Sequence, residues 1–402
     1  MKRLIVYSLI CLSFAFCKNQ STESTNVTGP IKATIDVNSK SISDCEGWDN
    51  LIADMDFIPL ETNDSCLMDE IRKVAVCENR ICVLSRNQGL FIFNTKGKLI
   101  NHLTAKGKGP LELLRPIDFN LSKSGKLYVL DQYKIIEYDL NGNPISEANL
   151  NLQITQTRPI NIYYHDSANI YTWYPAINTN TATNKYHLCV SDNHSSIKSK
   201  HIPFSHFTFG VEGRFSQSGK NEISIAPADL NDTIFIIKNG ELLPGFIIDI
   251  NNGKKKQIEP LIGNTSDDFQ FFDQLNHYML KHNLYSIGGN AVYNSTFLTF
   301  TISKPGEHFR CVYNYKTDDA YLLGCYENNA NSAIFYPVSI YCSFNDAFYS
   351  SKNAYQLRKF LDEGKTGCTF LPEKRRLELL DKIKDVKETD NPVLMVIKTK
   401  NK

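Results

Sequence analysis

Two arginines occupy matching places in this chain and carry the side chain best suited to holding an acidic group. Arg115 opens the segment RPIDF, and Arg158 opens the segment RPINI 43 positions later. A guanidinium group is flat and presents a fork of N–H donors that fits a carboxylate or a phosphate. Equivalent positions in a ring of repeats converge toward its axis, so the pair predicts a cationic surface that holds an acidic saccharide or a peptide carboxylate.

Three further residues are candidates for the same ligand-binding set. Arg72 falls near the corresponding place in the preceding repeat, Arg214 falls there in a later one, and Asp118 lies within the RPIDF segment. The alternative for the arginines is structural, because ion-pair networks also recruit such residues. An Asp or Glu of a neighbouring repeat, such as Glu112, is then the expected partner.

The elements that must position these residues are short strands that recur at a regular interval. The segment SGKLY at 124–128 is matched by SANIY at 167–171, again 43 positions later. The strand pair at 81–84 and 91–94 has a counterpart at 127–130 and 135–138, which puts the period in the mid-forties. A repeat of that length, built from strands and glycine turns, is typical of a β-propeller blade, which must stack on its neighbours to bury both faces.

The repeat predicts where the blades and the closing strands lie. Blades are expected at 66–104, 115–150, 158–204 and 214–250, and a fifth is marked by strands at 297–302 and 310–315. Strands from both chain ends must then close the ring to remove its last exposed edges, and the segments 31–37, 56–60 and 392–399 are suitable. Apolar residues at helical spacing predict a late amphipathic helix at 373–387 and a helical insertion at 267–282.

The connector before Arg115 contains a motif that can be compared with known repeats. Gly107-Lys108-Gly109-Pro110-x-Glu112-x-x-x-Pro116 resembles the connector of NHL-type propeller repeats, although Leu111 stands where that connector usually carries a second glycine. Segments at 56–62, 231–237, 311–317 and 390–394 extend the likeness, and the whole resembles the six-bladed, NHL/TolB-like β-propeller lipoproteins of Bacteroidota. The resemblance implies an all-β fold, with one six-bladed propeller over residues 31–402. The function of that family is largely unassigned.

The first residues read as a lipoprotein-type signal peptide over 1–17. Lys2 and Arg3 form the charged end, and the apolar core at 4–16 is shorter than the roughly 20 residues that span a membrane. Cys17 stands where bacterial lipoproteins carry their lipid, while plain secretion is the alternative because Phe16 before it is not small. Residues 18–30 are polar and aperiodic, as a flexible tether would be.

The sequence lacks the common catalytic motifs, and its candidate metal-binding segments also have ordinary structural explanations. The chain contains no Gly-x-Ser-x-Gly elbow, no His-Glu-x-x-His motif and no Gly-x-Gly-x-x-Gly motif after a strand. A metal pair at His201 and His206 is an alternative to an ordinary loop. The loop at 139–143 lacks the distal glutamate of a calcium site and predicts a hairpin turn. We expect no metal and no cofactor.

The cysteine count bears on the redox state of the mature chain. Eleven cysteines, less Cys11 and Cys17 in the leader, leave nine, and an odd number leaves at least one thiol outside any intrachain disulfide. Cys77 with Cys82, and Cys311 with Cys325, flank turns and are candidates for bridging. Adjacent antiparallel strands rarely offer good disulfide geometry, so buried free thiols are the favoured prediction for both pairs.

These observations favour a non-catalytic binding or scaffold protein of the bacterial envelope. The predicted location is a periplasm-facing or surface-exposed lipoprotein of the outer membrane, attached to the membrane through its lipid. A small molecule, a glycan or an envelope protein is the expected partner, and nucleic acid is not, because the net charge is only +1 with no basic run. The alternative is a propeller enzyme, a lactonase or lyase, with a metal or an acid–base pair at the mouth of the channel.

Overall fold

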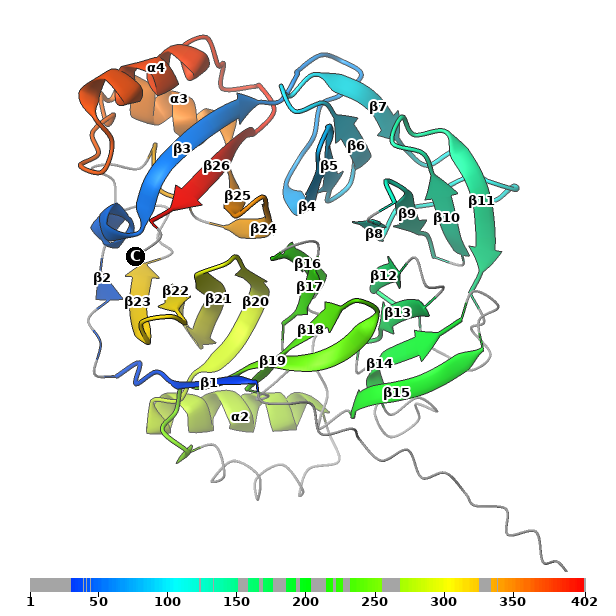
Figure 1. The fold of residues 1–402 in the computed structure, drawn as a ribbon, viewed down its shortest axis with the longest axis horizontal. Helices are drawn as coiled ribbons and strands as arrows, with labels where there is room; N and C mark the ends of the chain where they lie inside the picture. The colour runs from blue at the N-terminus through cyan, green and yellow to red at the C-terminus, as the bar shows by residue number, and fades with distance from the viewer. Residues whose placement is uncertain are drawn as a thin grey trace, which may run out of the picture.

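The chain forms a ring of six β-sheets around a common axis, and Figure 1 shows this ring along the axis. The computed structural model describes residues 30–400, apart from 39, 41, 44, 123, 133, 151–157, 166–168, 176–185, 193–195, 204–214, 220–221, 227–231, 255–267, 325–333 and 338. The predicted signal peptide with Cys17, most of the predicted tether, and Arg214 lie outside the described residues. The predicted six-bladed β-propeller is confirmed.

The first three blades follow the repeat that the sequence predicts, each with four antiparallel strands numbered from the axis outward. Blade 1 contains β4 (Ile71–Cys77), β5 (Arg80–Ser85), β6 (Gly89–Phe93) and β7 (Leu99–Leu103). Blade 2 contains β8 (Asp118–Leu121), β9 (Leu127–Leu130), β10 (Lys134–Tyr138) and β11 (Pro144–Asn149). Blade 3 contains β12 (Asn161–His165), β13 (Asn169–Trp173), β14 (Tyr186–Ser191) and β15 (Ile197–Pro203).

The remaining blades complete the ring. Blade 4 contains β16 (Phe215–Ser218), β17 (Glu222–Ile225), β18 (Thr233–Lys238) and β19 (Glu241–Asp249). Blade 5 contains β20 (Ser286–Tyr293), β21 (Phe297–Lys304), β22 (Glu307–Asn314) and β23 (Asp319–Gly324). Blade 6 contains β24 (Ile340–Phe344), β25 (Ala347–Lys352), β26 (Val393–Thr399) and, outermost, β3 (Ile52–Pro59).

Burial explains why the blade strands lack a simple alternation. Middle strands lie between two neighbouring blades, so both faces are covered, and every residue of β6 and β9 is buried. The outermost strand of a blade faces solvent, and β11 is exposed along most of its length. The apolar clusters accordingly lie between neighbouring blades, as Phe91 does between blades 6 and 1 and Phe119 does between blades 1 and 2.

Strands from both ends of the chain close blade 6, as predicted. β26 pairs antiparallel with β3, and the register matches Val393 with Pro59 and Lys398 with Asp54. This pairing joins residues more than 300 positions apart in sequence. It gives the ring its last sheet without leaving the inner edge of β3 unpaired.

The predicted strand at 31–37 does not take part in this closure. The part of this segment that forms a strand is β1 (Ile31–Thr34), which pairs in parallel with β19 as a fifth strand on the outside of blade 4. The short β2 (Ile42–Ser43) pairs in parallel with β23 on blade 5 in the same way. The N-terminal segment therefore covers the outer edges of blades 4 and 5 before it enters blade 6 as β3.

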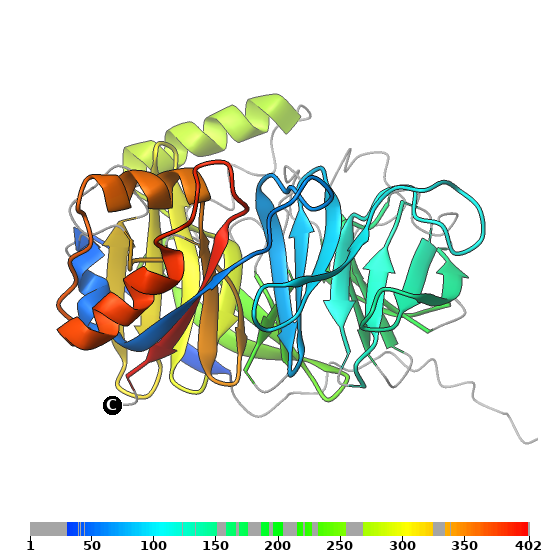
Figure 2. The ribbon, with the colours of Figure 1, turned by 90° about the horizontal axis from the view of Figure 1, so that it is seen from above.

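Three α-helices are present among the described residues. Figure 2 shows α2 (Asp268–His282) lying across one end of the ring, at the insertion that the sequence predicts. The predicted late helix is α4 (Glu373–Ile383), but its buried residues are Leu379 and Ile383, while Leu377 is exposed. α3 (Ala354–Asp362) was not predicted, and Asn353 caps its N-terminus by accepting the N–H of Tyr355. None of the described helices is long and apolar enough to cross a membrane.

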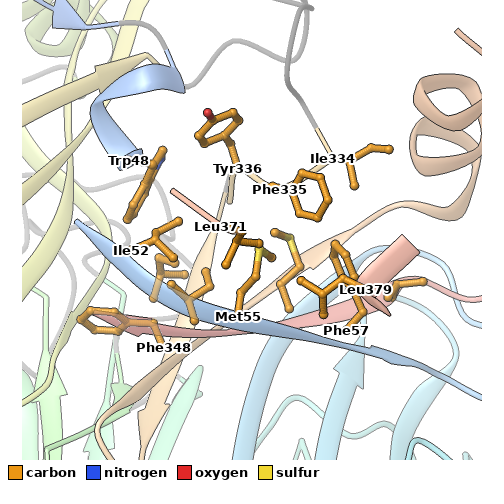
Figure 3. Packing of buried hydrophobic residues seen from close by; sticks show 14 of the residues in the cluster. Trp48, Ile52, Met55, Phe57, Ile334, Phe335, Tyr336, Phe348, Leu371 and Leu379 are labelled. Carbon is orange, nitrogen blue, oxygen red and sulfur yellow. The ribbon is translucent and has the colours of Figure 1, made fainter. Parts of the chain in front are cut away.

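The helices α3 and α4 seal the closing blade with a large apolar cluster. Figure 3 shows Trp48 and Ile52 from the N-terminal segment packed with Phe335, Leu371 and Leu379, which come from the last 70 residues of the chain. On the surface of α4, Arg375 and Lys382 form ion pairs with Asp54 and Asp56 of β3. The segment that contains α3 and α4 therefore stabilises the pairing of β3 with β26, where the two ends of the chain meet.

Side chains of the inner strands close the axis. Gln217 of β16 accepts the N–H of Val76 at 2.8 Å and donates to its carbonyl oxygen at 2.7 Å, so blade 4 bonds directly to blade 1 on the opposite side of the ring. Asn120 of β8 makes the same paired contact with the backbone of Tyr164 on β12, at 2.8 and 3.2 Å. Amide side chains thus take the place of strand partners at the centre.

Candidate functional site

Each blade runs from its inner to its outer strand, so all segments that lead to the next blade emerge at the same end of the ring. We call this end the connector face, and on blade 2 it carries residues 104–117 and, in the β9–β10 turn, Asp131 and Gln132. Asp131 in that turn bonds to the backbone of Leu114 and Arg115, which shows that the two segments lie together. The predicted arginines Arg115 and Arg158 both belong to this face.

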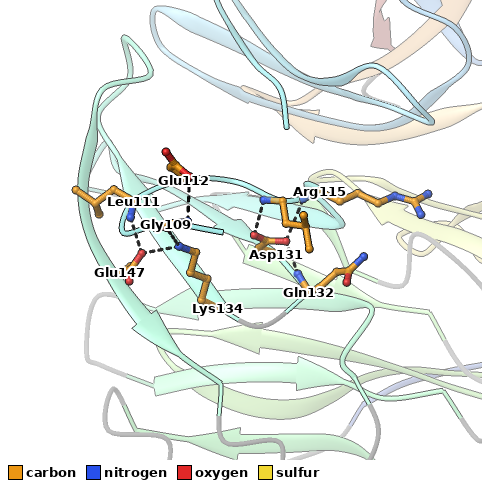
Figure 4. A network of polar contacts seen from close by, with 9 residues as sticks. Gly109, Leu111, Glu112, Arg115, Asp131, Gln132, Lys134 and Glu147 are labelled. Carbon is orange, nitrogen blue, oxygen red and sulfur yellow. Dashed lines mark hydrogen bonds and ion pairs between the residues drawn. The ribbon is translucent and has the colours of Figure 1, made fainter. Parts of the chain in front are cut away.

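Polar contacts hold the glycine-rich connector in shape, as Figure 4 shows. Glu112 accepts the N–H of Gly109 at 2.9 Å, and Lys134 donates to the carbonyl of Gly109 at 2.7 Å. Lys134 also forms a 2.7 Å ion pair with Glu147, which accepts the N–H of Leu111. The hydrogen bond from Lys134, and next that from the Leu111 amide, hold the pKa of Glu147 below its usual value.

Leu111 has a backbone conformation that is unusual for a residue other than glycine. Its φ angle is 58°, which is the left-handed region that a glycine adopts without strain. The backbone at this position therefore has a conformation that favours glycine, although a leucine occupies it. Its side chain packs against the apolar cluster between blades 1 and 2, which offsets part of the backbone cost.

Asp131 organises the turn beside the connector. It is only 2% exposed and directly follows β9. One carboxylate oxygen accepts the N–H of Leu114 at 2.8 Å, and the other accepts those of Arg115 at 3.1 Å and Gln132 at 2.5 Å. A carboxylate that accepts several backbone N–H groups forms strong charge-assisted bonds. The backbone at Arg115 and Gln132 is therefore fixed.

Arg115 and Arg158 present their side chains on the surface that results. Both are exposed, and each lies three residues before an inner strand, β8 or β12. A nitrogen of the Arg158 guanidinium donates to Gln132 at 3.1 Å, so the side chain from blade 3 reaches back to blade 2. Glu112, the predicted alternative partner of Arg115, instead bonds to the backbone of Gly109, and no ion pair found among the described residues includes Arg115.

Arg72 is placed differently from the other two arginines. It is half-buried and lies inside β4, at the point where the register with β5 slips between Ile71 and Lys73. It therefore does not precede an inner strand, as Arg115 and Arg158 do. Of the three predicted arginines that the structure describes, Arg115 and Arg158 share a placement on the connector face and Arg72 does not.

Asp118 lies inside the ring rather than on the connector face. It is 2% exposed, and its oxygens bond to Lys73 of blade 1 at 2.8 Å, to the Ile162 N–H of blade 3 at 2.8 Å and to the Asn161 amide at 3.3 Å. The ammonium of Lys73 also lies 5.4 Å from the centre of the Phe119 ring. This carboxylate thus joins the inner strands of three blades.

The structure also bears on the candidate metal sites and the calcium-type loop found in the sequence. Within the described part of the chain, no group of three or more His, Cys, Asp or Glu side chains could hold a metal ion. The loop at 139–143 is a hairpin turn in which Asp139 accepts the backbone N–H groups of Asn141 and Asn143 at 2.8 Å. His206 lies outside the described residues, so the structure does not address its pairing with His201.

Seven cysteines whose side chains the structure describes are free thiols, namely Cys66, Cys77, Cys82, Cys189, Cys311, Cys342 and Cys368. Cys77 and Cys82 do not form a disulfide, as predicted for this pair, although Cys77 is only half-buried. Burial raises the pKa of the Cys82 and Cys311 thiols, so both remain protonated, apolar side chains at neutral pH. Cys325, the predicted partner of Cys311, lies outside the described residues.

Sequence reasoning missed several residues that shape this surface. Asp131 and Gln132 carry a weak signal, since an acid that directly follows a buried strand is well placed to bind backbone N–H groups. Asn161 had a clearer signal, because it occupies the place of Asp118 in the matching segment RPINI. The contact between Lys134 and Glu147 had none, because it depends on the pairing of β10 with β11.

One solved structure matches this chain over nearly its whole length. A protein described as exported, from Bacteroides fragilis NCTC 9343, superposes with a TM-score of 0.69 at 15% identity over 93% of this chain and 100% of that one. The extracellular domain of a one-component system from Bacteroides thetaiotaomicron gives 0.39 at 12% identity over 73% and 41%. A protein of unknown function from Bacteroides caccae gives 0.30 at 11% identity over 43% and 59%. No curated protein matches the chain.

A family of sequences matches the whole propeller. The family is described as a domain of unknown function, DUF4934, and it matches residues 33–398. That range runs from β1 to β26, so it includes every blade together with α2, α3 and α4. The identity to the Bacteroides fragilis protein is low, so that likeness establishes the fold alone, whereas the family match covers the chain from its first strand to its last. This six-bladed β-propeller therefore belongs to the DUF4934 family.

Proposed function

We propose that this protein is a non-catalytic binding protein of the bacterial envelope that holds an acidic ligand on its connector face. The observation that supports this most is the placement of Arg115 and Arg158. Both side chains are exposed, and both residues bond to the β9–β10 turn, Arg115 through its backbone and Arg158 through its guanidinium. Two guanidinium groups beside one turn suit a ligand that carries a carboxylate.

The surroundings of the two arginines support an anionic ligand further. Asp131 directs both of its carboxylate oxygens to backbone N–H groups, and Glu112 directs one of its oxygens to the N–H of Gly109. These bonds reduce the competition of the two carboxylates with a ligand for the guanidinium donors. Lys106 and Lys108 are exposed in the same connector and add positive charge to this end of blade 2.

The proposed location is the bacterial envelope, with a lipid on Cys17 as the anchor. The leader pattern supports this, and so does the description of the Bacteroides fragilis propeller as an exported protein. Cells grown with radiolabelled palmitate test the anchor. The label should enter the wild-type protein and be absent from a Cys17→Ser variant, whereas equal labelling of both would exclude Cys17.

Calorimetric titration of the purified full-length protein tests the binding function. Galacturonate serves as the acidic saccharide, N-acetylalanine as the peptide carboxylate and galactose as the neutral control. We expect at least one acidic probe to bind and galactose not to bind. Each of Arg115→Ala and Arg158→Ala should weaken binding about tenfold, as expected for loss of one hydrogen-bonded ion pair, with little change in Tm.

Arg86 supplies a matched control on the same face. Its exposed side chain already lies 2.9 Å from Glu70, so its charge is neutralised within the chain. Arg86→Ala should therefore bind the acidic probe like the wild type. The proposed function is wrong if both arginine variants bind the probes like the wild type, or if stoichiometric Ca²⁺ or Zn²⁺ accompanies the purified protein and binding depends on it.

A further inference from the structure

We infer that Asp131 and Gln132 are positioning residues that bring Arg115 and Arg158 together on one anionic group of the ligand. This inference rests on the proposed function. The inference goes beyond the proposed function because it assigns roles to Asp131 and Gln132, neither of which is positively charged. It also states how many acidic groups the surface recognises at once.

Asp131 controls the backbone from which two of the side chains emerge. Its single carboxylate accepts the N–H of Arg115 at 3.1 Å and that of Gln132 at 2.5 Å through the same oxygen. The two backbone nitrogens are therefore close neighbours, although they belong to different segments of blade 2. Figure 4 shows the side chains of Arg115 and Gln132 leaving Asp131 in the same direction.

Gln132 brings in the second arginine. Its side-chain oxygen accepts a guanidinium N–H of Arg158 at 3.1 Å, which directs that side chain from blade 3 toward blade 2. Because the oxygen is used in this way, the remaining polar atom of the Gln132 amide is its NH₂ donor. The Arg158 guanidinium and the Gln132 amide thus lie together beside the β9–β10 turn, and the Arg115 side chain leaves from a backbone nitrogen next to that of Gln132.

The donor groups of these three side chains share a chemical preference. The Arg115 and Arg158 guanidinium groups and the Gln132 NH₂ group can satisfy several lone pairs of one carboxylate and suit an anion better than a sugar hydroxyl or an ammonium group. One carboxylate bound by both arginines makes their contributions interdependent, because removing either one leaves the anion poorly held. The expected recognition unit is therefore a single carboxylate, as in one uronic acid residue or one peptide C-terminus.

A double-mutant cycle on galacturonate binding distinguishes positioning from direct contact. If Gln132 acts mainly through Arg158, Gln132→Ala should weaken binding several-fold, and Gln132→Ala/Arg158→Ala should bind nearly as Arg158→Ala alone does. Asp131→Asn, which keeps the shape of the side chain but loses its charge, should weaken binding about tenfold. Digalacturonate should bind no more than a few-fold more tightly than galacturonate, since one carboxylate is recognised.

Asp69 provides the matched control for Asp131. It lies on the same face of blade 1, and its carboxylate accepts the side chain of Ser85 and the N–H of Asn87. Asp69→Asn should lower Tm to a similar degree as Asp131→Asn and leave galacturonate binding unchanged. This comparison separates a loss of stability from a loss of arginine positioning.

The outcomes separate this inference from the function on which it rests. If Arg115→Ala and Arg158→Ala lose binding while Gln132→Ala and Asp131→Asn bind like the wild type, the positioning roles are wrong and the binding function stands. If Gln132→Ala and Arg158→Ala weaken binding additively, Gln132 contacts the ligand independently and the positioning role is also wrong. If the arginine variants bind like the wild type, both proposals fall together.

Discussion

The ammonium of Lys73 on blade 1 lies 2.8 Å from the carboxylate of Asp118 on blade 2, and both side chains are almost fully buried. The other carboxylate oxygen of Asp118 accepts the N–H of Ile162 on blade 3. Two opposite charges near the axis therefore connect three consecutive blades. Burying such a pair is costly unless each charge keeps its partner, so the contact fixes how these blades meet.

Removing one member of this pair should destabilise the propeller strongly. Asp118→Asn leaves the Lys73 ammonium buried without a counter-charge, and we expect a loss of about 3 kcal/mol in the free energy of unfolding. Urea denaturation followed by tryptophan fluorescence measures this loss. The double variant Lys73→Met/Asp118→Asn should recover part of it, because it removes the isolated charge.

An exposed ion pair provides the control for this experiment. Lys384 and Asp381 lie 2.8 Å apart on the surface of α4 and just beyond its end, with more than half of each side chain exposed. Asp381→Asn should change the free energy of unfolding by less than about 1 kcal/mol. Equal effects of Asp118→Asn and Asp381→Asn would contradict the stabilising role of the buried pair.

Substitutions at Leu111 should reveal the strain of its backbone conformation. At a φ of 58°, a glycine avoids the roughly 1 kcal/mol that a Cβ atom costs, whereas an alanine keeps that cost and also loses the leucine packing. Leu111→Gly should therefore be more stable than Leu111→Ala by about 1 kcal/mol. Calorimetric Tm values measure the order, and an alanine variant as stable as the glycine variant would show that the turn is relaxed.

Acidification should weaken the connector through Glu147. Its pKa is lowered in the folded protein, first by the hydrogen bond from Lys134 and then by that from the Leu111 amide. The stabilisation is therefore present above the unfolded pKa of about 4.3, and it is lost as pH falls through the lower folded pKa. At pH 7, Glu147→Gln should be less stable than the wild type by about 1 kcal/mol, because solvent screens an exposed carboxylate even when it is hydrogen-bonded.

Urea denaturation of both proteins at pH 7, 5 and 3 checks this dependence. The difference between wild type and Glu147→Gln should persist at pH 5 and shrink toward pH 3, because the wild-type carboxyl then becomes neutral as well. Using the difference between the two proteins removes the contribution of other titrating carboxyl groups. A difference that stays constant across the three pH values would refute the role of the Glu147 charge.

Much of the architecture could be predicted because a propeller repeats itself locally. The match of RPIDF with RPINI placed β8 and β12 correctly, and the alternating segment at 392–399 identified β26. Strand patterns of this kind depend on neighbours a few residues away, so they are legible in the sequence. The predicted helix at 373–387 was found as α4, yet Leu377 is exposed while Leu379 is buried, since spacing alone does not say which face meets the core.

Contacts between blades could not be predicted in this way. The pairing of β1 with blade 4 joins Ile31 to Phe246, and no local pattern distinguishes that edge from the closing blade. Arg72 lies inside β4 rather than before it, so it does not belong with Arg115 and Arg158, although the sequence put it near the corresponding place. Each of these outcomes depends on which strand lies beside which.

By itself, the sequence determined the repeat length, the approximate places of the first four blades, and the equivalent places of Arg115 and Arg158. Only the tertiary structure decided that Gln217 closes the axis against Val76, that Asp118 is buried with Lys73, and that Asp131 and Gln132 link the two arginines. The physical reason is how far apart in the sequence the interacting groups lie. Strand formation follows from side chains a few positions apart, whereas burial and hydrogen bonding at the centre depend on groups that meet only after the ring has closed.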